Sequence, residues 1–141
     1  MITAIDTNIV VGVLEGEEAV ANHLARLVDR LAEKGDVLIS PIVYAELLAA
    51  PSRSPALVDA FLSQTAVRVD WSLEKAIWQM AGLAYRTYVL GRHMEGASVT
   101  SRRILADFLI GAHAVGRQAT LLTWDERIYH TYFPDLSTVA P

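Results

Sequence analysis

Four acidic residues lie in apolar segments, where a charge is costly unless it is paired, hydrogen-bonded or bound to metal. They are Asp6, Glu46, Asp107 and Asp125. Gathered in one place, four carboxylates repel one another, and some of them would stay protonated. Mg²⁺ or Mn²⁺ removes this penalty, because hard cations prefer oxygen ligands. Such a metal activates water and stabilises the charge that develops on a phosphate during in-line attack, which is the chemistry this set of residues predicts.

Three of the four acids also have an ordinary structural interpretation. Asp6 ends the apolar run 2–5 and Asp125 follows the run 120–123, so both suit the N-cap of a following helix. Glu46 is the single charge of the helical segment 42–50, where a solvent-facing position is the simpler explanation. The four acids are unusual as a set rather than one by one.

Asp107 is harder to explain without a function. The segment 104–114 is apolar around nearly the whole helical circumference, so a charge there needs a partner. Arg103, four residues earlier, is one candidate partner. Gly111 and Ala114, four and seven residues later, keep the Asp107 face of the helix small, as a close neighbour or a ligand requires.

The elements that must position these acids are short apolar strands alternating with helices. Strands are predicted over residues 2–5, 37–39, 67–69 and 120–123, with a fifth over 136–139. Helices are predicted over residues 9–14, 17–34, 41–50, 54–64, 72–90, 105–116 and 125–130, and residues 91–100 are predicted as a loop. The alternation predicts an α/β fold, a three-layer α/β/α sandwich around a mostly parallel four- or five-stranded sheet.

Ligands of such folds bind beyond the carboxyl ends of the strands. Asp6 lies just past the first predicted strand and Asp125 just past the fourth, while Glu46 and Asp107 lie on helices that are able to face the same crevice. The convergence of all four acids on one crevice is therefore the central structural prediction.

Length and composition are those of one domain spanning residues 1–141, with 52% hydrophobic residues and a mean hydropathy of +0.30. No apolar run approaches the ~20 residues of a membrane span, and the N-terminus is unlike a signal peptide. The absence of cysteine excludes disulfides and thiolate metal sites, so we expect a cytoplasmic protein. The net charge of -4 opposes nucleic-acid binding only weakly, because setting aside the four acids leaves 16 − 4 = 12 acidic against 12 basic residues.

The chain resembles the PIN-domain family, specifically VapC-type toxins of type II toxin–antitoxin systems. The matching pieces occur in family order and span nearly the whole chain. They are Ile5-Asp6-Thr7-Asn8, Tyr44-Ala45-Glu46-Leu47, the stretch from Ala106-Asp107-Phe108 to Ala112-His113-Ala114, and Leu121-Leu122-Thr123-Trp124-Asp125. Each motif is weak alone, and together they are specific.

This resemblance implies a PIN-like parallel sheet flanked by helices and a Mg²⁺- or Mn²⁺-dependent ribonuclease. It assigns Asp6, Glu46, Asp107 and Asp125 to the metal site, with Thr7, Asn8 and Thr123 in support. It also implies an RNA substrate, inhibition by a small antitoxin protein, and a homodimer.

The only local basic cluster is formed by Arg92, His93, Arg102 and Arg103. An ordinary solvated surface explains it, and phosphate contacts by Arg102 and Arg103 are the functional alternative. His113 is predicted to be a hydrogen-bonded core residue.

Four aromatic residues at helical spacing are predicted to belong to the core. They are Trp71, Trp78, Tyr85 and Tyr88. A contact surface for a second subunit or an antitoxin is the alternative.

Two other functional classes stay open at this point. One is a different enzyme on a similar fold, such as a phosphatase or a DNA-directed nuclease, although Asn8 stands where a haloacid-dehalogenase-like phosphatase has a second Asp. The other is a non-catalytic nucleotide-binding or protein-interaction module, which lacks support because no Gly-rich phosphate loop follows any strand.

Overall fold

The computed structural model describes residues 1–94 and 102–141, with the side chains of 1–92 and 105–141. Its centre is a five-stranded sheet in the order β3-β2-β1-β4-β5, in which every pairing is parallel. The strands are β1 (Ile2–Ile5), β2 (Asp36–Ile39), β3 (Val67–Val69), β4 (Thr120–Leu122) and β5 (Thr138–Val139). The predicted α/β fold with a parallel sheet is thereby confirmed.

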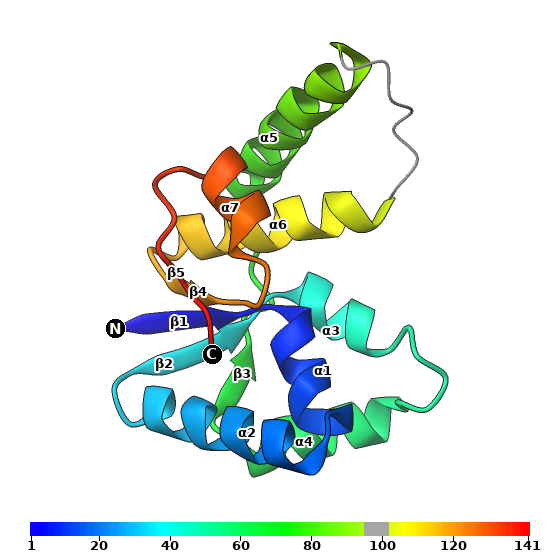
Figure 1. The fold of residues 1–141 in the computed structure, drawn as a ribbon, viewed down its shortest axis with the longest axis vertical. Helices are drawn as coiled ribbons and strands as arrows, with labels where there is room; N and C mark the ends of the chain where they lie inside the picture. The colour runs from blue at the N-terminus through cyan, green and yellow to red at the C-terminus, as the bar shows by residue number, and fades with distance from the viewer. Residues whose placement is uncertain (95–101) are drawn as a thin grey trace.

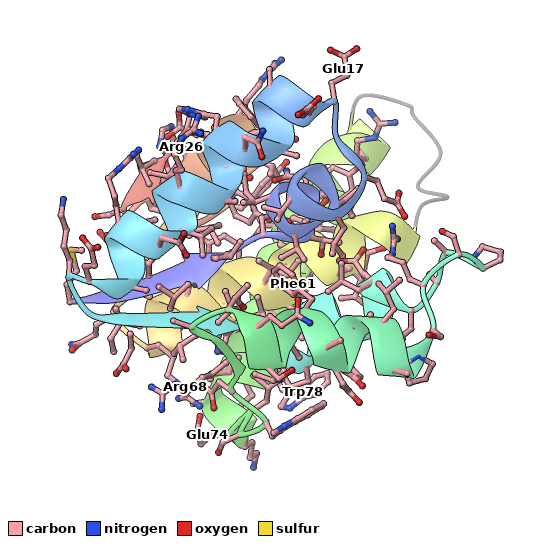
Figure 2. The ribbon with its side chains drawn as sticks, turned by 90° about the horizontal axis from the view of Figure 1, so that it is seen from below. Glu17, Arg26, Phe61, Arg68, Glu74 and Trp78 are labelled. Atoms are coloured by element: carbon pink, nitrogen blue, oxygen red, sulfur yellow. The ribbon has the colours of Figure 1, made fainter. Side chains whose placement is uncertain are left out.

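Seven helices surround the sheet in the described part of the chain. They are α1 (Thr7–Glu15), α2 (Glu18–Ala32), α3 (Pro41–Leu47), α4 (Pro55–Gln64), α5 (Lys75–Met94), α6 (Arg102–Gly116) and α7 (Glu126–Tyr132). In Figure 1, α5, α6 and α7 lie on one side of the sheet and α1, α2 and α4 on the other, while α3 lies beside its carboxyl edge. Figure 2, seen from below, shows α2 and α4 covering the lower face.

Two helices begin where the sequence predicts, at a serine followed by proline. The hydroxyl of Ser40 accepts the Val43 N–H at 3.4 Å, and that of Ser54 accepts the Leu57 N–H at 3.2 Å. Proline is tolerated at the first helical position because its missing N–H would find no partner in the helix there. The cap at Ser40 fixes the start of α3, the helix that carries Glu46.

Strand β1 lies at the middle of the sheet and is bonded on one side to β2 and on the other to β4. The chain order reverses between β1 and β4, because β2 and β3 continue on one side and β5 on the other. Such a reversal opens a crevice beyond the carboxyl ends of the two strands. Asp6 directly follows β1, and Thr123 directly follows β4.

Helix α5 departs from the prediction at both ends. It begins at Lys75 rather than residue 72 and runs to Met94, so the predicted loop over residues 91–100 is wrong for 91–94, and its remainder lies outside the described residues. Gly91 continues the helix instead of stopping it, since it has no positive φ of the kind that ends helices at glycine.

The prediction that the four aromatics belong to the core is half right. Tyr85 and Tyr88 pack against the core, next to the ring of Phe108. Trp71 and Trp78 are 65% and 50% exposed, so placing them in the core is wrong. The indole of Trp78 instead donates to the Leu73 carbonyl at 3.2 Å.

No helix among the described residues is long and apolar enough to cross a membrane.

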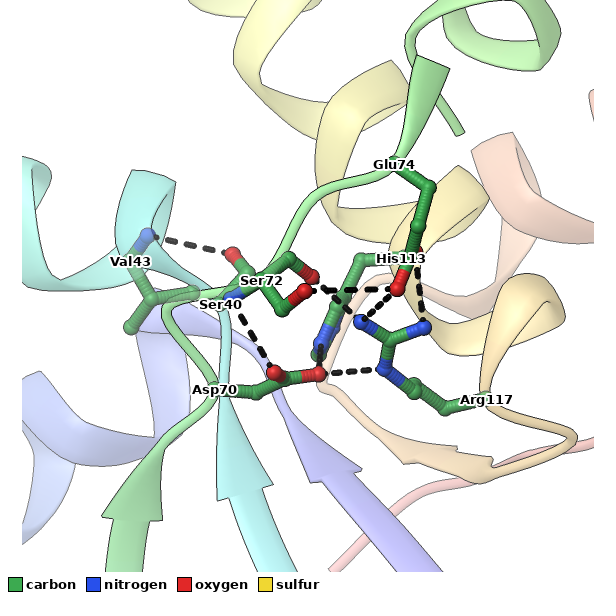
Figure 3. A network of polar contacts seen from close by, with 7 residues as sticks. All are labelled: Ser40, Val43, Asp70, Ser72, Glu74, His113 and Arg117. Atoms are coloured by element: carbon green, nitrogen blue, oxygen red, sulfur yellow. Dashed lines mark hydrogen bonds and ion pairs between the residues drawn. The ribbon is translucent and has the colours of Figure 1, made fainter. Parts of the chain in front are cut away.

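A polar network joins α6 to the segment between β3 and α5 (Figure 3). The buried His113 places its Nε2 3.0 Å from Asp70 Oδ2, which confirms the prediction of a hydrogen-bonded core histidine. Arg117 donates to the same Asp70 carboxylate and to the Ser72 carbonyl, and its Nη1 lies 2.9 Å from Glu74 Oε2. These contacts hold residues 70–74 in a non-helical conformation, which is why α5 begins late.

Candidate active site

The four predicted acids line one cleft of about 450 Å³ at the carboxyl ends of β1 and β4. Its lining residues are Asp6, Thr7, Asn8, Val11, Glu46, Asp107, Asp125, Ile128 and Tyr129. They come from the starts of α1 and α7, from α3 and from α6, so segments separated by more than a hundred residues meet here. The structure therefore brings together the acids that the sequence singled out.

Asp6 occupies the N-cap position of α1 but makes no capping hydrogen bond. Its Oδ2 instead accepts the hydroxyls of Thr123 at 2.8 Å and Tyr129 at 2.9 Å, and the amide of Asn8 at 3.4 Å. The residue is only 5% exposed yet lines the cleft, so these donors fix the carboxylate with Oδ2 turned into the protein. Asp6 therefore holds the predicted N-cap position, and its carboxylate is oriented by side-chain donors from distant segments.

Burial raises the pKa of Asp6, and the hydrogen bonds from Thr123 and Tyr129 offset only part of that rise. A cation in the cleft would stabilise the charged form that burial penalises. Burial also raises the pKa of the Tyr129 phenol, and the negative charges of Asp6, Asp107 and Asp125 raise it further. Tyr129 thus remains a protonated donor to Asp6 at neutral pH, and three of the four acids act on it electrostatically.

Glu46 is half-buried, and its Oε1 accepts the hydroxyl of Thr7 at 2.7 Å. This contact joins the first turn of α1 to α3 across 39 positions of sequence. A solvent-facing Glu46 is therefore not what the structure shows, since the side chain is oriented toward the cleft by Thr7.

Asn8 and Thr123 connect the two strand ends that frame the cleft. The Asn8 amide donates to Thr123 Oγ1 at 3.3 Å, and its Oδ1 accepts the Trp124 N–H at 3.3 Å. Thr123 Oγ1 in turn accepts the Asp125 N–H at 3.0 Å. The three supporting residues named from the sequence, Thr7, Asn8 and Thr123, thus all contact either a cleft acid or the backbone next to one.

Asp107 and Asp125 complete the acidic lining from α6 and from the start of α7. Asp107 is half-buried, whereas Asp125 is exposed at the N-cap position of α7 and makes no capping hydrogen bond. The alternative of an Arg103 partner for Asp107 falls on a side chain outside the described residues, as do the proposed RNA contacts of Arg102 and Arg103. The small face after Asp107 has a packing explanation. A Cβ on Gly111 would lie only 2.6 Å from the ring of Phe133, so the ring leaves no room for a side chain there.

Tyr129 is the cleft residue that the sequence did not single out. It stands four positions after Asp125, so on a helix beginning at Asp125 it faces the same side as that acid. That spacing was available in the sequence, whereas the contact of its hydroxyl with Asp6 across 123 positions was not.

The donor set of the cleft suits a hydrated hard cation. Its donors are carboxylate, hydroxyl and amide oxygens, which Mg²⁺ and Mn²⁺ prefer. No three acidic or histidine side chains among the described residues lie close enough to hold an ion by themselves. Mg²⁺ does not need such a cage, since it keeps several waters and binds through one or two carboxylates. The residues present therefore fit a partly hydrated ion rather than a closed structural metal site.

Known structures share this fold over the whole chain. The VapBC2 complex of Rickettsia felis, bound to a DNA fragment from its promoter, matches with a TM-score of 0.67 and 26% identity, covering 100% of this chain and 99% of that one. VapBC-1 of nontypeable Haemophilus influenzae matches with a TM-score of 0.63 and 22% identity, covering 99% and 98%. FitAcB of Neisseria gonorrhoeae matches with a TM-score of 0.59 and 21% identity, covering 98% and 96%.

No curated protein matches the chain significantly. The family model described as PIN domain matches residues 3–134, from the second residue of β1 to the second residue after α7. The resemblance to VapC-type PIN proteins that the motifs predict is confirmed by this model together with the VapBC2 structure, which is 26% identical over the whole chain. With nearly its entire length matched by the family model, the chain belongs to the PIN domain family.

Proposed function

We propose that this chain is a metal-dependent endoribonuclease, the toxin of a toxin–antitoxin pair, whose single nuclease domain spans residues 1–141. The observation that carries the proposal is the cleft at the reversal of strand order, which four acidic side chains from distant segments line together. Membership of the PIN family, whose members are nucleases, supports hydrolysis of nucleic acid.

In this proposal Asp6 and Asp107 are the principal ligands of Mg²⁺ or Mn²⁺, with Glu46 and Asp125 as further acidic groups. When bound, the ion lowers the pKa of water and neutralises charge developing on the phosphate. Thr123, Tyr129 and Asn8 hold the Asp6 carboxylate in one orientation, so no side-chain rearrangement of Asp6 is needed when an ion enters. Thr7 does the same for Glu46.

The proposed partners are RNA, a small antitoxin and a second copy of the chain, acting in the cytoplasm. The toxin role is supported by the Rickettsia felis neighbour, which is a VapBC complex and is 26% identical over the whole chain. The exposed Trp71 and Trp78 leave apolar surface that suits a protein contact, because aromatic residues are enriched at interfaces. Light scattering of the purified chain tests the homodimer.

The enzymatic proposal is tested by incubating the purified protein with structured RNA in Mn²⁺ or Mg²⁺, with and without EDTA. We expect cleavage that EDTA abolishes and that Asp6→Asn and Asp107→Asn reduce to background. The matched control is Asp36→Asn. Asp36 pairs with Arg68 at the exposed start of β2, whereas the cleft lies at the carboxyl ends of the strands. Cleavage that survives EDTA or both cleft substitutions would falsify the metal mechanism.

Thermal melting with Mn²⁺ tests metal binding by the protein itself, which a contaminating nuclease cannot mimic. Adding Mn²⁺ should raise the melting temperature, because a cation relieves the burial penalty on Asp6 and the repulsion among the acids. The increase should disappear in Asp107→Asn and persist in Asp36→Asn. An equal increase in all three proteins would mean that Mn²⁺ binds elsewhere.

A further inference from the structure

A second groove lies directly beside the acidic cleft, along α7. It measures about 310 Å³, within the ~300–1,000 Å³ typical of ligand pockets. Its lining residues are Tyr88, Asp125, Arg127, Ile128, Thr131 and Tyr132. Asp125 and Ile128 line both hollows, so the groove continues the cleft across the start of α7.

The groove is lined by one arginine, Arg127, together with the Asp125 carboxylate, and the fold does not use the arginine's charge. Arg127 is exposed and forms no ion pair with any residue the structure describes, whereas Arg53, Arg68 and Arg117 are each paired with a carboxylate. It stands two residues after Asp125, where the cleft ends. A guanidinium in this position is suited to a phosphate oxygen, which it binds through two parallel N–H donors.

The groove is also lined by two aromatic side chains that pack against the core. Tyr88 of α5 and Tyr132 of α7 are both half-buried, and their rings meet edge to face with centroids 5.8 Å apart. Both also pack against Phe108, the buried residue that follows Asp107 on α6. The two rings are thus held at a fixed position relative to the helix that bears Asp107. Aromatic faces at such positions stack unpaired bases of RNA.

We infer that this groove binds one unpaired nucleotide of the RNA strand adjacent to the cleaved bond. The Arg127 guanidinium binds the phosphate of that nucleotide, and its base stacks on the ring of Tyr132 or Tyr88. The inference rests on the proposed ribonuclease function and deepens it by assigning a nucleotide subsite to Arg127, Tyr88 and Tyr132 beside the cleft.

The test measures binding of a fluorescein-labelled ten-nucleotide oligouridylate by fluorescence anisotropy, in Mg²⁺ and at several KCl concentrations. All variants carry Asp6→Asn to prevent turnover. Arg127→Gln should weaken binding about fivefold or more and reduce the slope of log K against log[salt] by about 0.7, the value for one lost phosphate contact on a single strand. The matched control is Arg26→Gln, because Arg26 is an equally exposed helix arginine on α2, across the sheet from α7 (Figure 2).

Stacking is tested separately at Tyr132. Tyr132→Leu should weaken binding severalfold without changing the salt slope, and Tyr132→Phe should bind like the parent because the aromatic face is kept. Replacing the bases of the oligonucleotide by abasic units should weaken binding to the parent and remove the difference between parent and Tyr132→Leu. A purely structural role of Tyr132 would leave that difference in place. Melting temperatures identify any variant that folds poorly. If Tyr132→Leu folds poorly, Arg127→Gln still decides the test, because Arg127 is exposed.

The outcomes separate the groove from the nuclease function. If RNA cleavage depends on Asp6 while Arg127→Gln and Tyr132→Leu bind oligouridylate like the Arg26→Gln control, the inference about the groove is overturned and the nuclease proposal stands. If the chain cleaves no RNA but both variants lose binding as expected, the groove stands as an RNA site and the nuclease proposal fails.

Discussion

Asp6 receives three side-chain donors on a single carboxylate oxygen, from α1, from the end of β4 and from α7. Two of the donors, Asn8 and Tyr129, also line the cleft themselves. Hydrogen bonds to a carboxylate favour its charged form and fix its rotamer, whereas burial acts against the charge. The orientation of Asp6 therefore depends on Tyr129 and Thr123 as much as on its own backbone position.

Tyr129→Phe removes one of these donors and little else, because the ring stays buried. We expect RNA cleavage to fall by about 10- to 100-fold, the usual cost of losing a hydrogen bond to a metal-binding carboxylate. The matched control is Tyr44→Phe, which deletes a phenol hydroxyl that bonds the exposed Asp59 at 3.0 Å. Initial rates of both variants in Mn²⁺ measure the effect, and equal rates for the two would mean that the Tyr129 hydroxyl does not orient Asp6.

At the level of single residues, the sequence predicts the acids well and their donors poorly. An acid directly after an apolar strand, such as Asp6, is visible because the strand end fixes its place in the fold. The role of Tyr129 cannot be predicted in this way, because its contact with Asp6 depends on how α7 packs against the strand ends. Helical spacing also failed for Trp71, which lies in the non-helical segment before α5, and for Trp78, because spacing does not show whether a helical face is covered.

Helix α6 illustrates what spacing reveals at the level of elements. The glycine one turn after Asp107 correctly indicates a close neighbour, but the neighbour is the ring of Phe133 rather than a ligand. The sequence shows that this face of α6 is small. Which group packs against the face depends on the position of the residues after α7. The late start of α5 has a similar origin, in contacts of Arg117 that no local pattern encodes.

Two helix glycines should respond to alanine with opposite signs. Gly111→Ala places a Cβ 2.6 Å from the Phe133 ring and should destabilise the fold by about 1–3 kcal/mol through overpacking. Gly82→Ala on α5 meets no atom within 4 Å and should stabilise it by about 0.5–1 kcal/mol, because alanine loses less backbone entropy in a helix. Urea unfolding midpoints measure both, and a stabilising Gly111→Ala would contradict the packing described for α6.

At the scale of the whole molecule, the Asp70 network links the sheet, α5 and α6. Burial alone would raise the pKa of Asp70, but the hydrogen bonds from Arg117 and His113 lower it to about 2. Since an unfolded Asp titrates near 3.8, the unfolded chain binds more protons between these two values. Asp70 therefore stabilises the fold above that range, and its contribution is lost as pH falls toward 2.

Asp70→Asn should lower the free energy of unfolding by about 2 kcal/mol at pH 6, and the deficit should shrink to roughly half by pH 3. The matched control is Asp36→Asn, because the Asp36–Arg68 pair is more than half exposed on both sides and such pairs contribute little. Urea titrations at the two pH values measure both variants. A deficit for Asp70→Asn that is the same at pH 3 and pH 6 would contradict the role of its charge.

The overall architecture is predictable from the alternation of apolar strands and helices. Asp6 and Asp125 follow from the strand ends, and Glu46 and Asp107 from the apolar helical segments in which they lie. The strand order cannot be predicted from this alternation, because strands that are distant in the sequence pair with one another. Residues 3–5 of β1 pair with residues 120–122 of β4, a contact between the two ends of the chain that no local signal indicates. The assembly of the cleft at the β1–β4 boundary is therefore a property of the complete fold.

That pairing has a consequence for synthesis. Thr123 and Tyr129, which orient Asp6, are synthesised more than a hundred residues after it. A nascent chain that contains α1 and α3 but not yet β4 and α7 has no finished cleft. Translation itself thus delays assembly of the cleft until residues 120–132 have been made.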